Sequence, residues 1–252
     1  MHPVLFNFGN LKIFSYGAMV ALGVLFSTVF VYRLALKRGL DAEKIVDLIF
    51  WIVVWGLIGG RLFYVLINPE IYFKNPLEII KINKGGLVFH GSLLGAIITA
   101  LVFVKKSKQP LFETLDIIFV FLPLAHALGR VGCFLNGCCA GKPTQSFLGV
   151  IFPGHSLRVH PTQLYSAFFL LIIFLILYFL EKKKHFAGEI VSLYLIIYGV
   201  MRFAIEYLRD NPKVLGDLTM FQCISIVLIL LGGVLHNALK SKRKSGKLEE
   251  KT

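Results

Sequence analysis

The stretch "QLYSAFFLLIIFLILYFL", Gln163–Leu180, carries no charged side chain. It is close to the roughly 20 apolar residues that an α-helix needs to cross a bilayer. Further apolar segments of similar length lie near Tyr16–Leu36, Ile45–Ile67, Leu87–Val104, Phe112–Leu128, Glu189–Leu208 and Leu218–Leu239. The sequence therefore predicts an all-α polytopic membrane protein with seven transmembrane helices.

Composition supports a membrane protein. Of the 252 residues, 56% are hydrophobic, whereas soluble domains have about 45–50%. No internal repeat is evident, and the length suits one bundle. We expect a single membrane-embedded domain over residues 1–252, with a basic tail from about residue 240.

The formal net charge of +13 is a possible sign of nucleic-acid binding, but its distribution argues against such a partner. Basic residues gather in "RLALKRGLDAEK", "KKSK", "EKKKH" and the tail "KSKRKSGKLEEK", and the alternate connections are less basic. Cytoplasmic loops of membrane proteins carry this excess of Lys and Arg. The pattern predicts an N-terminus outside and a C-terminus in the cytosol.

Two of the predicted outer connections, residues 68–86 and 131–162, are long, and the second is rich in Gly, Pro and Cys. Irregular backbone at membrane depth requires protein or a water-filled cavity to satisfy its polar groups. We therefore expect a structured outer cap or a re-entrant segment.

Several polar residues fall within the predicted spans, where a charge costs about 2.5–3.5 kcal/mol at the helix centre. The predicted topology puts them all in the outer half of the membrane, which indicates a polar chamber there. Guanidinium groups match phosphate oxygens, so the arginines suggest a phospholipid head group as ligand. These polar positions are Tyr16, Arg61, His90, His126, Arg130, Gln163, Tyr165, Tyr198, Arg202 and Glu206.

Each residue also has a purely structural interpretation. Arg202 and Glu206, four residues apart, could neutralise each other, and Arg61 could extend its charge to the interface. His90 could serve helix packing. The glycines of "GLIGG" and "GSLLG" are most simply small faces for helix packing.

The segment "GRVGCFLNGCCAG", Gly129–Gly141, combines polarity with backbone freedom. We expect Gly129, Gly132 and Gly137 to allow tight turns and close approach to a ligand, with Asn136 as a hydrogen-bonding group. The chain has four cysteines but neither a CxxC motif nor the paired spacing of a zinc site. For Cys138 and Cys139 we favour a packing or structural role.

Taken in order, these motifs resemble the prolipoprotein diacylglyceryl transferases of bacteria along nearly the whole chain. The matching segments are "YGAM" at Tyr16, "GGR" at Arg61, "FHGSLLG" at His90, "GRVGCFLNGCCAG" at Arg130, "HPTQLY" at His160 and "YGVMRFAIEYLR" at Tyr198.

The resemblance implies an enzyme of the bacterial cytoplasmic (inner) membrane that takes part in lipoprotein maturation. Such an enzyme transfers the sn-1,2-diacylglyceryl group of phosphatidylglycerol to the lipobox cysteine of a prolipoprotein signal peptide and releases glycerol phosphate. No metal and no cofactor are implied, and we expect a monomer without a nucleic-acid partner.

The resemblance also implies roles for individual residues. His90, Arg130 and Arg202 are the expected catalytic residues, the arginines acting on the lipid phosphate and His90 as base or polar contact. Some family members have Asn where this chain has Cys133 and Glu where it has Cys138, so no role of that Asn or that Glu is carried over to this chain. The expected substrate-binding residues are Tyr16, Arg61, Asn136, Gly141, Gln163, Tyr198 and Glu206.

Three other functions compete with this interpretation. A lipid or anion transporter would use the same arginines without a base, but no inverted repeat is evident. A thiol oxidoreductase would use Cys138 and Cys139, but it would normally contain CxxC. An intramembrane protease would need a nucleophile segment of the GxSxG type, which the sequence lacks.

Overall fold

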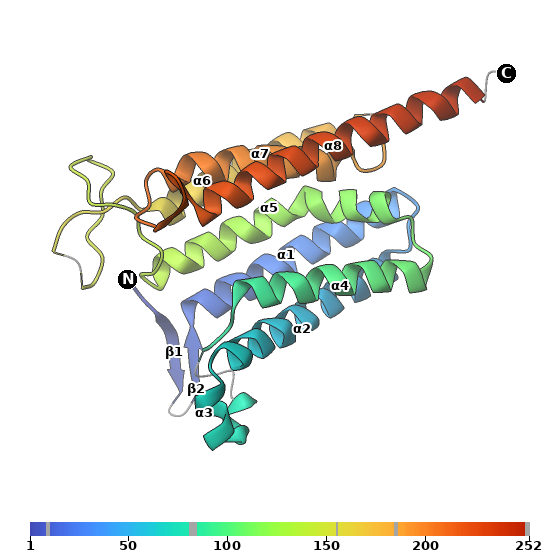
Figure 1. Ribbon diagram of the computed structural model, residues 1–252. Helices are drawn as coiled ribbons and strands as arrows, with labels where there is room; N and C mark the ends of the chain where they lie inside the picture. Colours follow the sequence, from blue (N-terminus) through green and yellow to red (C-terminus); the bar gives the residue numbers. More distant parts are fainter. Residues whose placement is uncertain (9–10, 81–84, 155, 184–185, 250–252) are drawn as a thin grey trace. The chain divides into compact units, whose positions relative to one another are not determined.

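The computed structural model describes residues 1–8, 11–80, 85–154, 156–183 and 186–249 of a mainly helical chain (Figure 1). The chain divides into two compact units. Met1–Phe30 and Leu115–Thr252 form unit 1, and Val31–Thr114 form unit 2.

Six helices are long and apolar enough to cross a membrane, which confirms the predicted class of fold in its main feature. A further helix, α7, has 18 residues that include Glu189, Arg202 and Glu206, so it is less apolar than the six. The six helices are α1 (Ser15–Lys37), α2 (Ala42–Ile67), α4 (Phe89–Ser107), α5 (Leu111–Leu135), α6 (Thr162–Glu181) and α8 (Met220–Glu249), and α7 covers Glu189–Glu206.

The end of α5 differs from the prediction. The apolar pattern ended near Leu128, but α5 continues to Leu135. Gly129 and Gly132 are therefore helical, and the expectation that they form tight turns is wrong. Gly132 instead allows a close helix contact, because a Cβ there would lie 3.0 Å from the Cβ of Met19 in α1. Only Gly137 has the predicted turn geometry, with φ of +74°.

Short elements occupy the N-terminal segment and two of the connections. In unit 1, β1 (Val4–Phe8) pairs with β2 (Leu11–Phe14), and β3 (Lys213–Leu215) pairs with β4 (Leu218–Thr219), both antiparallel. In unit 2, the connection 68–86 contains α3 (Pro69–Lys74) and the 3₁₀ helix η1 (Pro76–Ile79), each with proline in its first turn. Residues 81–84 of this connection, 184–185 of the basic segment "EKKKH" and 250–252 of the tail lie outside the described residues.

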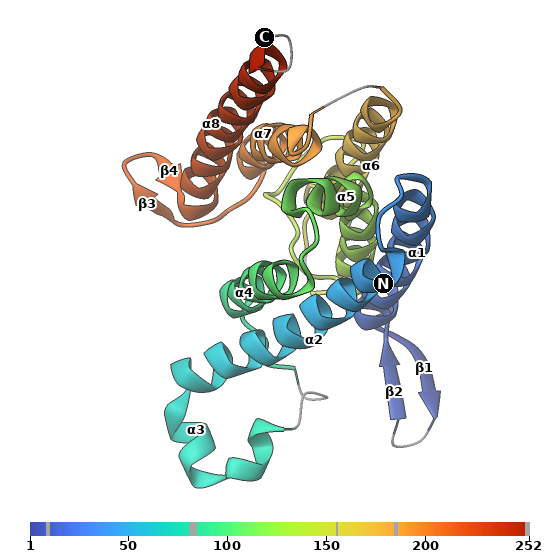
Figure 2. The same ribbon diagram turned by 90° about the vertical axis from the view of Figure 1, so that its right-hand side faces the viewer.

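Unit 2 depends on the close packing of α2 against α4 (Figure 2). A Cβ built on Gly59 would lie 2.5 Å from the carbonyl oxygen of Gly91, and Gly95 meets the backbone of Trp55. The amide of Val88, just before α4, donates to the carbonyl of Gly60 at 3.0 Å. The glycines of "GLIGG" and "GSLLG" thus form the small-residue helix interface that the sequence suggested.

In unit 1, α7 packs against both α6 and α8, and the three helices run side by side in Figures 1 and 2. The buried carboxylate of Asp116 in α5 accepts from the backbone amides of Gly188 at 2.7 Å and Val191 at 3.0 Å. A carboxylate at this position stabilises the positive end of the α7 dipole. The core between these helices is apolar, with Leu170, Leu177 and Ile190 fully buried.

We predict that Gly59→Ala destabilises the full-length protein in detergent by about 1–3 kcal/mol, the usual cost of overpacking. The added methyl group would meet the backbone of Gly91, which cannot move without shifting α4. Gly233→Ala in α8 is the matched control, because a Cβ there has no neighbour within 4 Å. Thermal unfolding measures both variants. Equal melting temperatures for Gly59→Ala and wild type would contradict the close packing of α2 and α4.

Candidate active site

The polar stripe of α7 is built around a buried ion pair. Arg202 Nη1 lies 2.5 Å from Glu206 Oε2, and the two residues are 9% and 1% exposed. The other carboxylate oxygen, Oε1, accepts from Asn211 Nδ2 at 2.7 Å and from Thr219 Oγ1 at 2.9 Å. The guanidinium carbon of Arg202 lies 4.6 Å from the ring centroid of Phe221. Glu206 therefore neutralises Arg202 and also joins α7 to the start of α8.

Arg130 belongs to the same cluster. It lies in the last turns of α5, half-buried, one turn after His126. The ring of His126 packs at 5.5 Å from that of Tyr198, and His126 is within electrostatic range of both Arg130 and Arg202. Unit 1 thus brings together polar residues of α5 and α7, which lie far apart in the sequence.

The turn after α5 has the hydrogen bonds of a Schellman motif. The amide of Cys138 donates to the carbonyl of Cys133 at 3.1 Å, and the amide of Gly137 donates to that of Phe134 at 3.0 Å. This motif needs a left-handed residue at its centre, which Gly137 supplies. Asn136, immediately before Gly137, is exposed.

Residues from α6 hold this turn in place. The side-chain amide of Gln163 donates to the carbonyl of Cys138, and the hydroxyl of Thr162 donates to the carbonyl of Cys139 at 3.0 Å. Both side chains are fully buried. Gln163 Oε1 has no hydrogen-bond partner among the described residues. The side-chain nitrogen of Gln163, a predicted site residue, therefore positions the backbone of the turn after α5.

Arg209 is a member of the cluster that sequence reasoning missed. Its Nη2 donates to the carbonyl of Cys139 at 2.8 Å, and its Nε donates to Thr162 Oγ1 at 3.3 Å. Burial and the nearby charges of Arg202 and Arg130 lower the pKa of Arg209. The available signal was its spacing, because residue 209 is seven positions after Arg202 and would fall on the same face of a helix that continued past Glu206.

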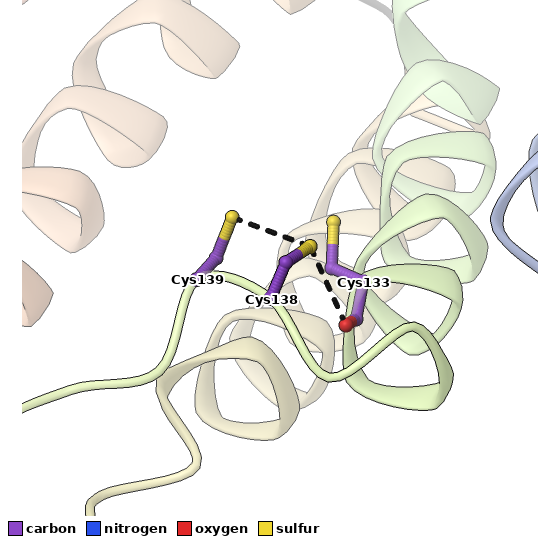
Figure 3. A group of neighbouring side chains, drawn as sticks. All are labelled: Cys133, Cys138 and Cys139. Atoms are coloured by element: carbon purple, nitrogen blue, oxygen red, sulfur yellow. Dashed lines mark hydrogen bonds between the residues drawn. The ribbon is translucent and has the colours of Figure 1, made fainter. Parts of the chain in front are cut away.

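The thiols of Cys133, Cys138 and Cys139 lie together at the end of α5, with all three sulfur atoms within 4.8 Å of one another (Figure 3). The pKa of Cys139 is lowered to about 5, chiefly by a hydrogen bond from Cys133, with Cys138, Arg209 and Arg130 contributing. Burial raises the pKa of Cys138. Cys139 is exposed and Cys138 is partly exposed.

Two further predicted residues of unit 1 adjoin this turn. The amide of Gly141 donates to the carbonyl of His160 at 2.8 Å, and a Cβ on Gly141 would overlap the carbonyl of Leu208. Gly141 is therefore required by close backbone packing. Tyr16 lies in the first turn of α1, is 47% exposed, and is within electrostatic range of Cys133 and Arg130.

Arg61 and His90 belong to unit 2. The guanidinium of Arg61 donates to the carbonyls of Glu78 at 2.6 Å, Ile79 at 2.9 Å, Gly85 at 2.8 Å and Gly86 at 3.1 Å. Arg61 is buried, and its side chain holds together the connection 68–86. His90, in the first turn of α4, is exposed, with its ring 5.9 Å from that of Phe89.

A hollow of about 670 Å³ lies beside the end of α5 in unit 1. Its lining comes from the N-terminus, from Phe134 and Leu135, and from residues 150–154. None of the predicted site residues lines this hollow. Its lining is mainly apolar.

Comparison with known proteins agrees with the motifs. The family model described as "Prolipoprotein diacylglyceryl transferase" matches residues 3–237. The chain belongs to this family. It is similar to the phosphatidylglycerol–prolipoprotein diacylglyceryl transferase of Clostridium tetani, with 36% identity over 245 residues that cover 94% of this chain and 97% of the relative. The corresponding protein of Finegoldia magna is 35% identical over 252 residues and the full length of both chains. That of Wolbachia pipientis is 34% identical over 247 residues, or 94% of each.

Membership of the family confirms the resemblance proposed from the sequence. The match includes the whole of unit 2 and most of unit 1, so both contribute segments that the family shares. The roles of the individual side chains stay predictions.

We predict that Glu206→Gln lowers the free energy of unfolding by about 3–5 kcal/mol, because it leaves the buried charge of Arg202 without its partner. Glu113→Gln, at an exposed glutamate in the first turn of α5, is the matched control. Chemical or thermal unfolding in detergent measures both. A Glu206→Gln protein as stable as the control would mean that the ion pair does not support the fold.

Proposed function

We propose that this chain transfers the sn-1,2-diacylglyceryl group of phosphatidylglycerol to the lipobox cysteine thiol of prolipoproteins, forming a thioether and releasing glycerol phosphate. This is the first step of bacterial lipoprotein maturation. The observation that carries the proposal is the family match over residues 3–237. The arginine cluster of unit 1 supports it, because the donor lipid carries a phosphate.

We further propose that α7 crosses the membrane as a seventh span of one monomeric, single-domain enzyme in the bacterial cytoplasmic membrane. The charges of Arg202 and Glu206 do not oppose this, because they neutralise each other and are hydrogen-bonded within the protein. The loop charges favour an outside N-terminus, a cytosolic C-terminus and an outer cap formed by the connections 68–86 and 131–162.

The phosphate of the lipid is the proposed ligand of Arg130, with Arg209 and Arg202 alongside. Since Glu206 already neutralises Arg202, Arg130 and Arg209 supply the uncompensated positive charge. Among the described residues, no carboxylate forms an ion pair with Arg130. As the bond between the glyceryl carbon and the phosphate oxygen breaks, negative charge grows on the leaving group, and preorganised guanidinium groups stabilise it strongly where water is excluded.

The acceptor thiol requires a base, because the thiolate is the effective nucleophile. We propose His90 for this role from its residue type and its place in the family motif. Its side chain is exposed in unit 2, and histidine is the side chain that most often acts as a general base. The thiolate then attacks the glyceryl carbon, and glycerol phosphate leaves with the electron pair of the C–O bond.

The remaining predicted residues divide by their contacts. Tyr16, Asn136 and Tyr198 are proposed to contact substrate, and Tyr16 and Asn136 are both exposed. Gln163 and Gly141 hold backbone segments, so we propose that they act on the reaction by positioning the turn after α5. Arg61 is proposed to act in the same way on its own connection.

The direct test mixes the purified full-length protein, phosphatidylglycerol and a peptide that contains a lipobox cysteine. Mass spectrometry should find a diacylglyceryl addition on the cysteine of the peptide.

We predict that Arg130→Lys reduces the rate by about 10-fold to 100-fold, because lysine cannot form the bidentate fork. This is the loss expected for a charge-assisted hydrogen bond worth about 1.5–3 kcal/mol. Arg33→Lys, at an exposed arginine near the end of α1, is the control. Normal activity of Arg130→Lys would exclude the bidentate contact.

For His90→Gln, we predict a loss of turnover of roughly 10²–10⁴-fold, the range for a general base, with lipid binding retained. Glutamine keeps hydrogen bonding but cannot take up the proton. His236→Gln is the control, since the ring of His236 hydrogen-bonds Ser192 at 3.1 Å and its exchange tests the general tolerance of the fold. Turnover of His90→Gln within about threefold of wild type would remove His90 from the role of base.

The orientation predicts that a reporter fused after Lys240 reads as cytoplasmic, because the basic tail "KSKRKSGKLEEK" favours the cytosolic side. A second reporter, inserted at Gly154 in the connection 131–162, should read as extracytoplasmic. The opposite pair of results would reverse the proposed topology.

A further inference from the structure

Three of the four cysteines lie close together in space at the end of α5. The sulfur atoms of Cys133, Cys138 and Cys139 lie within 4.8 Å of one another, and those of Cys138 and Cys139 are 3.6 Å apart (Figure 3). All are free thiols. The transfer reaction takes its thiol from the prolipoprotein, so the proposed function does not account for this cluster.

The backbone builds the cluster in two steps. The Schellman motif places the side chains of its first and last residues in contact, a contact that is usually hydrophobic; here the two residues are Cys133 and Cys138. Cys139 then adopts φ of +67°, a left-handed conformation that is unfavourable for a residue other than glycine. This strained conformation places a third thiol beside the first two.

Neighbouring side chains fix the same turn from outside. The carbonyl of Cys138 accepts from Gln163, and the carbonyl of Cys139 accepts from Thr162 and Arg209. These hydrogen bonds fix the backbone of the turn. They use its carbonyl oxygens and leave the three thiols together. Such a supporting shell holds metal ligands in position before the ion arrives.

We propose that Cys133, Cys138 and Cys139 form a three-thiolate site for a thiophilic metal ion of the Zn²⁺ class. A Zn–S bond of about 2.3 Å in tetrahedral geometry puts sulfur atoms about 3.8 Å apart, so the observed cluster needs only small side-chain movements. Three protein ligands leave a fourth position open to water or another ligand. This site goes beyond the proposed function, for which neither the motifs nor the resemblance implied a metal.

The local charges suit such an ion. Three thiolates and one divalent ion together carry a net charge of about −1. Arg130 and Arg209 are both within electrostatic range of Cys139 and offset this charge. Cys139 is exposed, which gives an ion a route into the site.

The test uses the full-length protein in detergent with a non-thiol reductant, stripped with a chelator and then titrated with Zn²⁺ or Co²⁺ alone. We expect one ion per chain. For Co²⁺ we also expect the intense visible d–d bands of a tetrahedral site and a thiolate-to-metal charge-transfer band in the near ultraviolet. Cys133→Ser, Cys138→Ser and Cys139→Ser should each weaken binding by at least about 10-fold. Cys223→Ser, in α8 and outside the cluster, is the matched control and should bind as wild type does.

A second measurement needs no substitution. Zn²⁺ should protect Cys133, Cys138 and Cys139 of the wild-type protein from alkylation and leave Cys223 unprotected, as read by peptide mass spectrometry. Absence of stoichiometric binding, equal protection of Cys223, or binding that survives all three single substitutions would overturn the proposal. So would an internal disulfide among the three cysteines in protein whose thiols were blocked before lysis. None of these readouts uses the transferase reaction, so failure of the metal site and failure of the proposed function are separable.

Discussion

The buried pair of Arg202 and Glu206 is the interaction on which the arrangement of unit 1 depends. A lone charge in this position would be left without compensation, at a cost of about 3–5 kcal/mol. Glu206 also accepts from Asn211 and Thr219, so the same carboxylate fixes the segment between α7 and α8. Arg209 lies within that segment. The ion pair therefore makes α7 compatible with apolar surroundings. By fixing the segment after α7, Glu206 also helps to position Arg209.

The irregular parts of the chain share a second constraint, since backbone carbonyls outside helices need donors where water is scarce. In unit 2, Arg61 supplies donors to the carbonyls of its connection, from Glu78 to Gly86. In unit 1, Gln163 and Arg209 do the same for the turn after α5. Some polar residues that the sequence predicted as ligand contacts therefore form hydrogen bonds to the protein backbone in the structure.

The sequence predicted the helical architecture because apolar runs of membrane length are a strong signal, and all seven predicted segments are helices. It misplaced the end of α5, because glycine and arginine in "GRVG" resemble a helix end, whereas Gly132 serves contact with α1. The stripe of Tyr198, Arg202 and Glu206 was readable from its period. Arg209 followed that period but lay beyond the apolar segment. The cysteine cluster was not readable, since it depends on a left-handed Cys139 that no spacing rule indicates.

The arginines link the proposed lipid site to the proposed metal site. Because Glu206 neutralises Arg202, the positive charge available to a lipid phosphate comes chiefly from Arg130 and Arg209. The same two arginines lie within electrostatic range of Cys139. Ionised thiols without a metal would compete with the phosphate for these charges, whereas a bound divalent ion would cancel most of the thiolate charge. Occupation of the cysteine site is thus expected to strengthen phosphate binding at Arg130, although no ligand is shared between the two sites.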